Sequence, residues 1–494
     1  MQHFYRTWYI PEKKNVMKEQ LFGREEECRL SRKYLSSNKS EFVAVYGRRR
    51  IGKTFLLRQT LGDSLCFSFA GMANVTNVQQ LLNFNLTLRQ YMPEAKMSTN
   101  WQEAFMELQR YVESCKQEIK VLFFDELPWM DTPKSNFISA FEHFWNAWAS
   151  ARSDIKLFVC GSAASWMLDN VINNHGGLHN RVTHKVHLKQ FTLNECQQYA
   201  DNLKLGMTQR QILECYMIMG GVPFYWSFIN RRLGLAQNID SIFFDEDAAL
   251  KGEFDELYSS LFREPESYIT IVTTLGMKKA GMTREELARE GNLQENGKLT
   301  QALEDLEYCG FIRKYRQFGK KVKGTVFQLT DLYTLFYFKY IQKNERGDKQ
   351  FWSKNLNTPM HSIWCGLAFE RVCLLHVDQI KSALSIGGVQ SSEASWTSSQ
   401  NRTDDSAVRG AQIDLLIDRN DDVIDICEMK YYTDEFVMDE NEANRINNRI
   451  LRLREETGTD KAIHAVLVTT KGLKRNAYSD VIQAVVTMPD LFKG

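Results

Sequence analysis

The chain has 494 residues and a formal net charge of +1, with 43% apolar and 25% charged residues. This length exceeds what one hydrophobic core supports, so we expect three or more domains. The near-zero charge excludes nucleic-acid binding through overall positive charge, and any basic surface must be local. No apolar run reaches the length of a membrane span, and the first residues lack the apolar segment of a secretion signal. The ten cysteines show no C-x-x-C spacing, which is typical of reduced thiols in a cytoplasmic protein.

After an N-terminal extension over residues 1–19, residues 20–190 alternate between strand-like and helix-like stretches. Short apolar runs at 42–46, 121–124 and 157–160 each end where polar or glycine residues begin. Buried parallel strands have this pattern, because helices cover both of their faces. We therefore predict a first domain built from repeating βα units.

The segment after the first apolar run matches the phosphate-binding pattern G-x-x-x-x-G-K-[ST] over residues 47–54. Its glycines let backbone N–H groups surround phosphates, and the helix that follows adds the positive end of its dipole. Lys53 is expected to reach the β- and γ-phosphates, and Thr54 to ligate Mg²⁺. A chance match in a loop is the alternative. We predict a site for ATP and Mg²⁺ that is formed by Gly47, Arg48, Arg49, Arg50, Ile51, Gly52, Lys53, Thr54 and Phe55.

Polar residues also follow the other two apolar runs. The run at 121–124 ends in Asp125 and Glu126, which we expect to hold the Mg²⁺ shell and to polarise the attacking water, respectively. The run at 157–160 is followed by Ser162, which either senses the γ-phosphate or marks an ordinary strand exit of small residues.

These residues resemble the archaeal-type ATPases of the AAA+/STAND assemblage of P-loop proteins. The resemblance rests on the run of three arginines in the phosphate loop, the acidic pair after the second strand, and two further short motifs, Phe22-Gly23-Arg24 and Gly221-Val222-Pro223. It implies that Phe22 and Arg24 lie near the adenine and that Gly221 and Pro223 contact the base and ribose. It also implies that Arg181 senses charge, for which an exposed ion-pair arginine is the alternative.

The family resemblance extends to a helical lid over residues 191–255 and a winged helix over residues 256–350. Thr283 and Glu286 form a capping-box pattern, and two helices and a hairpin follow, which is the outline of a winged helix. Basic residues gather in the wing: Arg313, Lys314, Arg316, Lys320, Lys321 and Lys323. They indicate DNA as a partner. A winged helix used for protein packing or self-association is the alternative, because acidic residues occupy the predicted recognition helix.

Residues 351–494 are predicted to be a separate α/β domain with a flexible loop at 387–410. Two strands at 412–417 and 423–428 are expected to form a hairpin that places Asp414 beside Glu428. Strand alternation puts Lys430 on the same face as Glu428. Two carboxylates with a nearby lysine can bind Mg²⁺ and orient water for phosphodiester attack. This stretch resembles the PD-(D/E)xK nuclease fold, and the resemblance makes Glu370 its helix-borne acid.

The predicted architecture is α/β and multi-domain: a P-loop NTPase βα core, a helical lid, a winged helix and a C-terminal endonuclease-like α/β domain. The function expected of it is ATP hydrolysis coupled to a DNA-directed, nuclease-like domain. The alternative is an ATP-dependent switch or regulator whose nuclease fold is inert. No membrane association is expected.

Overall fold

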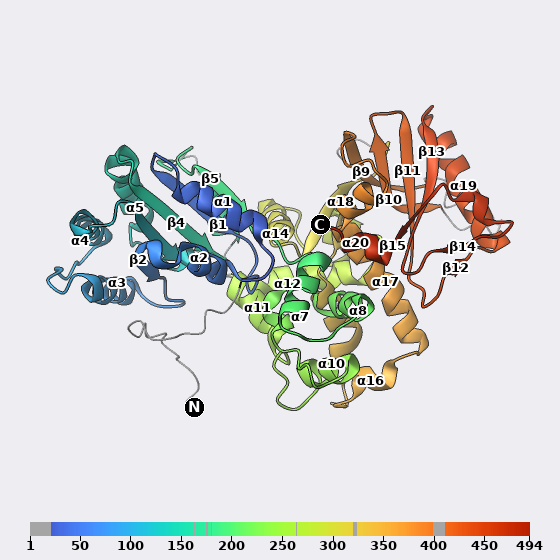
Figure 1. The fold of residues 1–494 in the computed structure, drawn as a ribbon, viewed down its shortest axis with the longest axis horizontal. Helices are drawn as coiled ribbons and strands as arrows, with labels where there is room; N and C mark the ends of the chain where they lie inside the picture. The colour runs from blue at the N-terminus through green and yellow to red at the C-terminus, as the bar shows by residue number, and fades with distance from the viewer. Residues whose placement is uncertain are drawn as a thin grey trace.

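The structure is a computed structural model that describes residues 21–162, 164–173, 176–178, 180–262, 264–319, 324–398 and 411–494. Figure 1 shows one sheet with its helices at one end of the molecule, a second sheet at the other end, and a helical region between them. No helix in the described ranges is both long and apolar enough to cross a lipid bilayer.

The first sheet has five parallel strands in the order β2-β3-β4-β1-β5. Their bounds are β1 (Glu41–Tyr46), β2 (Leu65–Ala70), β3 (Lys120–Asp125), β4 (Ile155–Gly161) and β5 (His184–His187). This confirms the parallel α/β core that the apolar runs predict. Because β4 lies between β1 and β3, the segments that follow these three strands meet at one edge of the sheet.

Alternate residues of β1 pack into two cores on opposite faces of this sheet. Val43 and Val45 pack with the helices on one face, α1 (Glu25–Leu35) and α2 (Lys53–Leu61). Phe42 and Ala44 face an aromatic-rich core on the other side. Three helices supply that core: α3 (Asn77–Tyr91), α4 (Trp101–Ser114) and α5 (Phe137–Ala147). Burial on both faces fixes the direction of the strand and therefore the loop that leaves its end.

A helical unit follows, and a tight chain crossing positions it. Its helices are α7 (Leu193–Asn202), α8 (Gln209–Met219), α9 (Pro223–Trp226), α10 (Leu235–Phe243) and α11 (Glu253–Leu261). Gly221 lies between α8 and α9, and its carbonyl oxygen accepts from the backbone N–H of Phe191, just before α7, at 2.7 Å. A Cβ on Gly221 would lie 1.9 Å from the Phe191 carbonyl oxygen, so this crossing requires glycine.

The next elements follow the order predicted for the winged helix. They are α12 (Pro265–Met277), β6 (Met282–Thr283), α13 (Arg284–Glu290), α14 (Gly297–Tyr308), β7 (Ile312–Arg316) and β8 (Thr325–Leu329). Thr283 caps α13, with the reciprocal hydrogen bond from the Thr283 backbone to Glu286. The three strands form an antiparallel sheet in the order β6-β8-β7.

The C-terminal part combines helices with a mixed sheet in the order β15-β13-β11-β10-β9. The helices are α15 (Leu332–Phe336), α16 (Phe351–Asn355), α17 (Pro359–Leu375), α18 (Val377–Ala383), α19 (Glu440–Thr457) and α20 (Met488–Leu491). The strands of the sheet are β9 (Ser391–Thr397), β10 (Gln412–Arg419), β11 (Val423–Lys430), β13 (Ala462–Thr469) and β15 (Ala484–Thr487). A separate short pair consists of β12 (Phe436–Val437) and β14 (Leu473–Lys474).

The prediction of a flexible loop over residues 387–410 is wrong for its first part. Residues 391–397 form β9, which pairs with β10 and buries Trp396 in the core of this sheet. The serine-rich composition conceals a strand whose Ala394 and Trp396 pack into the core. Residues 399–410 lie outside the described part of the chain.

A buried histidine joins the C-terminal part to the helical unit. His376 Nε2 accepts a hydrogen bond from the backbone N–H of Leu193 at 3.0 Å, and Nδ1 lies 2.8 Å from the carbonyl oxygen of Val372. The ring is 1% exposed, and burial lowers the pKa of His376 from 6.5 to about 4. The accepting nitrogen requires the neutral ring.

This arrangement predicts acid sensitivity of the fold. Between pH 6.5 and 4 the unfolded chain binds a proton at His376 that the folded chain does not, so stability falls as the pH is lowered through this window. The full loss is on the order of 3 kcal/mol. Thermal unfolding midpoints measured from pH 4 to 8 should fall less steeply for His376→Gln than for the parent. Equal slopes for the two proteins would show that this histidine is not held neutral.

Candidate functional site

The phosphate loop joins the end of β1 to the start of α2. Gly47 and Gly52 have φ angles of 141° and 88°, a conformation that L side chains rarely adopt. A Cβ on Gly47 would lie 2.3 Å from the carbonyl oxygen of Leu188, so the loop also approaches its neighbour too closely for any side chain there. The glycine spacing of the motif therefore has a direct geometric cause.

Lys53 lies inside this loop. Its Nζ donates to the carbonyl oxygens of Gly47 at 2.9 Å and Arg48 at 2.8 Å, and the residue is 5% exposed. Burial lowers the pKa of Lys53 from its ordinary value, and the carboxylates of Glu126 and Asp125 oppose that shift. An ammonium group surrounded by loop backbone at a helix N-terminus suits a phosphate chain.

Thr54 and Asp125 meet at the ends of neighbouring elements. Thr54 Oγ1, in the first turn of α2, donates to Asp125 Oδ1 at 2.9 Å. Asp125 is 5% exposed and also accepts from the thiol of Cys160 at 2.7 Å. Burial and the Asp125 carboxylate raise the pKa of Cys160 well above its ordinary value, which keeps the sulfur a donor. A hydroxyl and a carboxylate this close are oxygen ligands of the kind Mg²⁺ prefers.

Glu126 stands beside this pair, with its backbone in the left-handed region at φ 48°. Ser162 Oγ lies 3.0 and 2.9 Å from the two carboxylate oxygens of Glu126, and the Ser162 backbone N–H donates to one of them at 3.2 Å. Ser162, predicted as a phosphate sensor or a plain strand exit, thus holds Glu126. That contact fixes the orientation of the Glu126 carboxylate.

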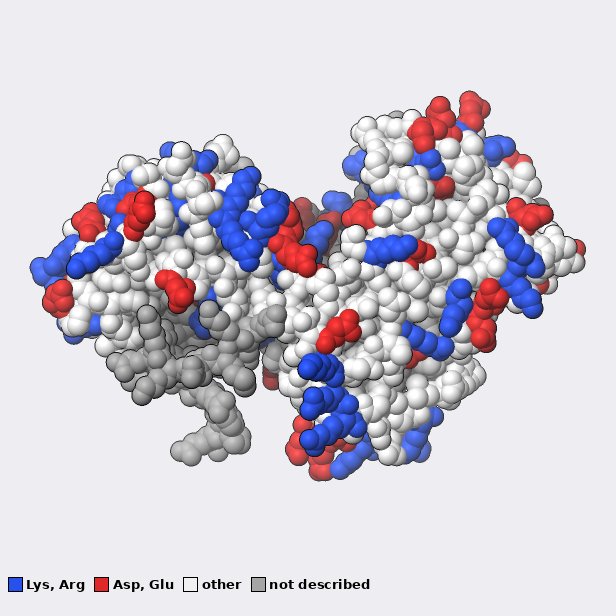
Figure 2. All heavy atoms as spheres, in the orientation of Figure 1, with Lys and Arg blue, Asp and Glu red and all other residues white. Residues whose placement is uncertain are grey.

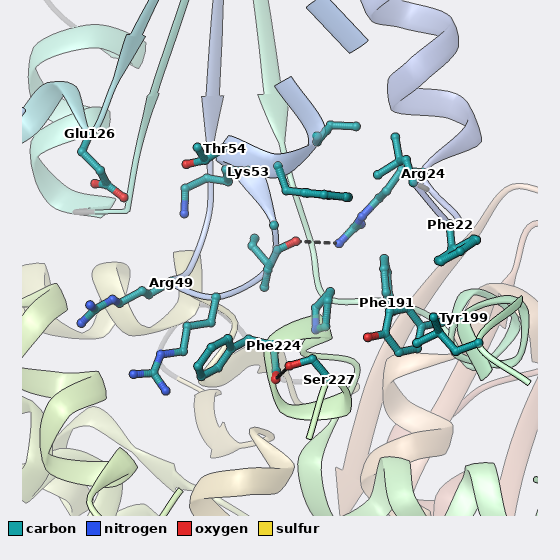
Figure 3. Close-up of a pocket in the computed structure, with 18 residues that line it drawn as sticks. Phe22, Arg24, Arg49, Lys53, Thr54, Glu126, Phe191, Tyr199, Phe224 and Ser227 are labelled. Atoms are coloured by element: carbon teal, nitrogen blue, oxygen red, sulfur yellow. Dashed lines mark hydrogen bonds between the residues drawn. The ribbon is translucent and has the colours of Figure 1, made fainter. Parts of the chain in front are cut away.

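A cavity of about 600 Å³ connects these groups. Its lining includes loop residues 49–56 together with Leu21, Phe22, Arg24, Glu126, Phe191, Tyr199, Leu203, Pro223, Phe224 and Ser227. Figure 3 shows Glu126 at one end of the cavity, Lys53 and Thr54 in the middle, and Phe22, Phe191 and Tyr199 at the other end. The apolar, aromatic end suits a nucleobase, and the polar end suits its phosphates.

The sequence-predicted residues divide into those that line this cavity and those that support it. Arg24 donates through Nη2 to the carbonyl oxygen of Lys189 at 2.6 Å and packs over the ring of Phe191. Gly221 stands behind Pro223 in the tight crossing described above and does not line the cavity. Arg48 and Arg181 do not line the cavity, and Arg181 is exposed to solvent.

Sequence reasoning missed part of the aromatic end. Phe191, Tyr199, Leu203, Phe224 and Ser227 line the cavity from the helical unit. Phe224 follows Pro223 and Ser227 follows the short helix α9, so the chain break at residues 220–223 was a sequence signal for these two. Tyr199 and Leu203 had none, because their place depends on how α7 packs beside Phe22.

The C-terminal carboxylates do not meet in one site. Lys279 Nζ lies 2.5 Å from Glu370 and 3.9 Å from Asp414, so these two acids share a lysine near α17. Glu428 instead pairs with Arg449 of α19 at 2.5 Å and with Lys430 at 3.1 Å. No group of three or more His, Cys, Asp or Glu side chains that could hold a metal ion occurs among the described residues.

The prediction that Asp414 lies beside Glu428 is therefore wrong, because the two carboxylates have different partners. The strands pair antiparallel as expected, with Leu415 opposite Cys427, and both side chains enter the core beneath α17. Glu428 follows Cys427 and faces the opposite side, toward α19. Pairing with β9 shifts register between Ile413 and Leu416, and this bulge accounts for Asp414 turning toward α17.

The predicted DNA-contacting wing is only partly exposed. Arg313 donates to Gln328 at 2.6 Å and packs over Tyr315, so its guanidinium is engaged within the fold, contrary to its predicted phosphate contact. Lys314 and Arg316 are exposed, whereas Lys320, Lys321 and Lys323 lie outside the described residues. On the face in Figure 2, basic and acidic side chains are interspersed.

Comparisons with known proteins find one family model and several relatives that match parts of this chain. Residues 21–227 match the model of the family described as an ATPase domain predominantly from Archaea. An uncharacterized protein of Methanocaldococcus jannaschii is 24% identical over 325 residues, which are 65% of this chain and 69% of that protein.

Solved structures that match this chain include the Walker-type ATPase of Pyrococcus abyssi, at 19% identity and a TM-score of 0.45, covering 64% of this chain and 95% of the other. Another is the ORC2 protein of Aeropyrum pernix in ADPNP and ADP complexes, at 16% identity and a TM-score of 0.36, covering 70% and 97%. The family match and the cavity lie in the same residues. The chain therefore contains an archaeal-type P-loop ATPase domain.

Proposed function

We propose that this chain hydrolyses ATP between its βα core and its helical unit and uses the nucleotide state as a switch for the rest of the molecule. The observation that carries the proposal is the contact between Thr54 and Asp125 at 2.9 Å, in which Thr54 lines the same cavity as Lys53 and Glu126. These are the residue types that phosphoryl transfer requires: a phosphate-binding lysine, two oxygen ligands for a metal and a carboxylate for water.

Each residue then has a definite task. Lys53 binds the β- and γ-phosphates, and loop N–H groups bind the remaining oxygens. Thr54 and Asp125 would hold Mg²⁺, which supplies positive charge against the phosphate oxygens. Glu126, held by Ser162, orients a water molecule and takes its proton. Phe22, Tyr199 and Pro223 exclude solvent around the base.

The direct test is ADP release by the purified full chain. We expect turnover with ATP and Mg²⁺, loss of turnover when EDTA removes the metal, and recovery when Mg²⁺ is returned. A rate that is unaffected by EDTA would contradict the assignment of Thr54 and Asp125.

For the C-terminal part we propose a nuclease-like unit that binds without cutting. The support is the separation of the acids: Glu428 is held by Arg449, and Asp414 and Glu370 share Lys279. An active nuclease of this kind needs adjacent carboxylates for Mg²⁺. DNA is the proposed partner, and the exposed Lys314 and Arg316 of β7, in the predicted winged helix, would contact its phosphates.

This part of the proposal predicts DNA retention without strand breaks. With ATP and Mg²⁺, supercoiled plasmid should be shifted in a gel yet stay uncut. The double charge reversal Lys314→Glu with Arg316→Glu should weaken retention about equally for unrelated sequences, because phosphate contacts are sequence-independent. Nicking that disappears in Asp414→Ala or Glu428→Ala would contradict the proposal and restore the nuclease.

A further inference from the structure

The phosphate loop carries three consecutive arginines, and their side chains contact different parts of the molecule. Arg49 and Arg50 both line the nucleotide cavity, whereas Arg48 does not. Arg48 is 4% exposed and forms an ion pair with Asp331, at the start of α15. Arg50 forms an ion pair with Glu253, at the start of α11, and a second with Glu256 at 3.1 Å. Arg48 and Arg50 are thus anchored to two helices outside the βα core.

The Arg48 anchor is the more deeply buried. Asp331 is 2% exposed, and its other carboxylate oxygen accepts from the backbone N–H of Thr334 at 2.9 Å and from the Thr334 hydroxyl at 2.7 Å. The Arg48 guanidinium also packs over the ring of Phe311, 4.7 Å from its centroid. Two of its nitrogens have no hydrogen-bond partner within the described part of the chain, and Asp331 is the carboxylate that pairs with it.

The Arg50 anchor connects the loop to the cavity's own wall. Arg50 has φ 71°, an unusual conformation for a non-glycine residue that needs support from its surroundings. Its guanidinium lies 4.4 Å from the ring centroid of Phe224, which lines the cavity. Glu253 also accepts from the hydroxyl of Tyr225 at 2.6 Å, which fixes the carboxylate.

The Arg48 anchor acts on a peptide group that Lys53 contacts. Lys53 Nζ donates to the backbone carbonyl oxygen of Arg48 at 2.8 Å, and the guanidinium of Arg48 forms an ion pair with Asp331. A phosphate chain competes for the same ammonium group, so its arrival changes the hydrogen bonding of the residue that Asp331 anchors. The Arg48 anchor therefore lies on a short path between the nucleotide and α15.

We propose that Asp331 and Glu253 are positioning residues of the ATP site, which hold the phosphate loop in its binding shape through Arg48 and Arg50. This inference rests on the proposed ATPase function and adds a dependence on docking: the site is complete only while α11 and α15 are seated against the loop. Preorganisation of this kind lowers the cost of binding, because the loop does not have to be ordered by the ligand.

The test removes each ion pair without leaving a buried charge. Removing one partner of a buried pair is strongly destabilising, whereas replacing both is often tolerated. In Arg48→Met with Asp331→Asn, the asparagine keeps the helix cap on α15. In Arg50→Met with Glu253→Gln, the glutamine keeps an acceptor for Tyr225. The matched control is Arg29→Met with Glu26→Gln, an exposed pair on α1.

We expect each anchor variant to raise the Kd for mant-ATP and the KM for ATP by about tenfold or more, with a smaller change in kcat. The thermal midpoint should stay close to that of the parent, and Arg48→Lys should recover part of the affinity because it keeps the pair with Asp331. A purely structural role would lower the folded fraction and leave the Kd of folded protein unchanged.

The outcomes are separable from failure of the proposed function. If the parent binds mant-ATP but does not hydrolyse it, the ATPase proposal fails and the Kd comparison still tests the anchors. If folded anchor variants bind within twofold of both parent and control, the positioning roles of Asp331 and Glu253 are overturned. Absence of binding by the parent overturns both.

Discussion

Lys53→Ala is expected to abolish ATP hydrolysis and to weaken ATP binding by more than about 100-fold. The ammonium group is buried within hydrogen-bonding distance of the loop carbonyls, at the position where the β- and γ-phosphates are expected. Alanine removes a charged donor from a poorly solvated site, and neighbouring amides cannot replace its charge. Binding is measured by mant-ATP fluorescence, and turnover by ADP release.

The control for Lys53→Ala is a lysine-to-alanine change outside the cavity. Lys33→Ala on the exposed side of α1 serves this purpose, because Lys33 is outside the cavity lining. Both variants should unfold near the parent's midpoint, since Lys53 pairs with loop carbonyls and not with a buried acid. Binding by Lys53→Ala within a few-fold of the parent would place the nucleotide elsewhere.

Glu126→Gln is expected to keep ATP bound and to slow its hydrolysis by about 100-fold or more. Glutamine retains an acceptor oxygen for Ser162, so the side chain should keep its place, but it cannot accept a proton from water. Single-turnover experiments with radiolabelled ATP separate the chemical step from binding and product release.

Ser162→Ala provides the matched comparison for that step. It leaves the Glu126 carboxylate in place and removes the hydroxyl that contacts both of its oxygens. We expect a smaller reduction in the single-turnover rate than for Glu126→Gln, because the base remains and only its orientation is loosened. Full activity of Glu126→Gln would mean that another group activates the water.

Local spacing explains what the sequence predicted well. The Gly47 to Thr54 motif and the acids after the 121–124 run depend on short-range geometry, because parallel buried strands deliver their ends to one edge of a sheet. The contact of Thr54 with Asp125 follows from that geometry once β3 and β1 flank β4.

Long-range packing explains what could not be predicted. Alternation along two strands placed Asp414 and Glu428 together, but a register shift in the pairing with β9 separates them. That strand was itself hidden in a serine-rich segment. Arg313 looked like a phosphate contact because nothing in its local sequence indicates the contacts with Gln328 and Tyr315.

The partners of Arg48 and Arg50 show the same limit. Asp331 is 283 residues away from Arg48 along the chain, and Glu253 is 203 residues away from Arg50. A run of arginines in a phosphate loop suggests contacts with phosphate, whereas two of these three side chains point to acids on other helices.

The most direct measurement is the equilibrium binding of ATP to the full-length chain with and without Mg²⁺, followed in the same samples by ADP formation. We expect saturable binding at one site per chain that Mg²⁺ strengthens, followed by conversion to ADP. Failure to bind ATP at millimolar concentration by folded protein would contradict it.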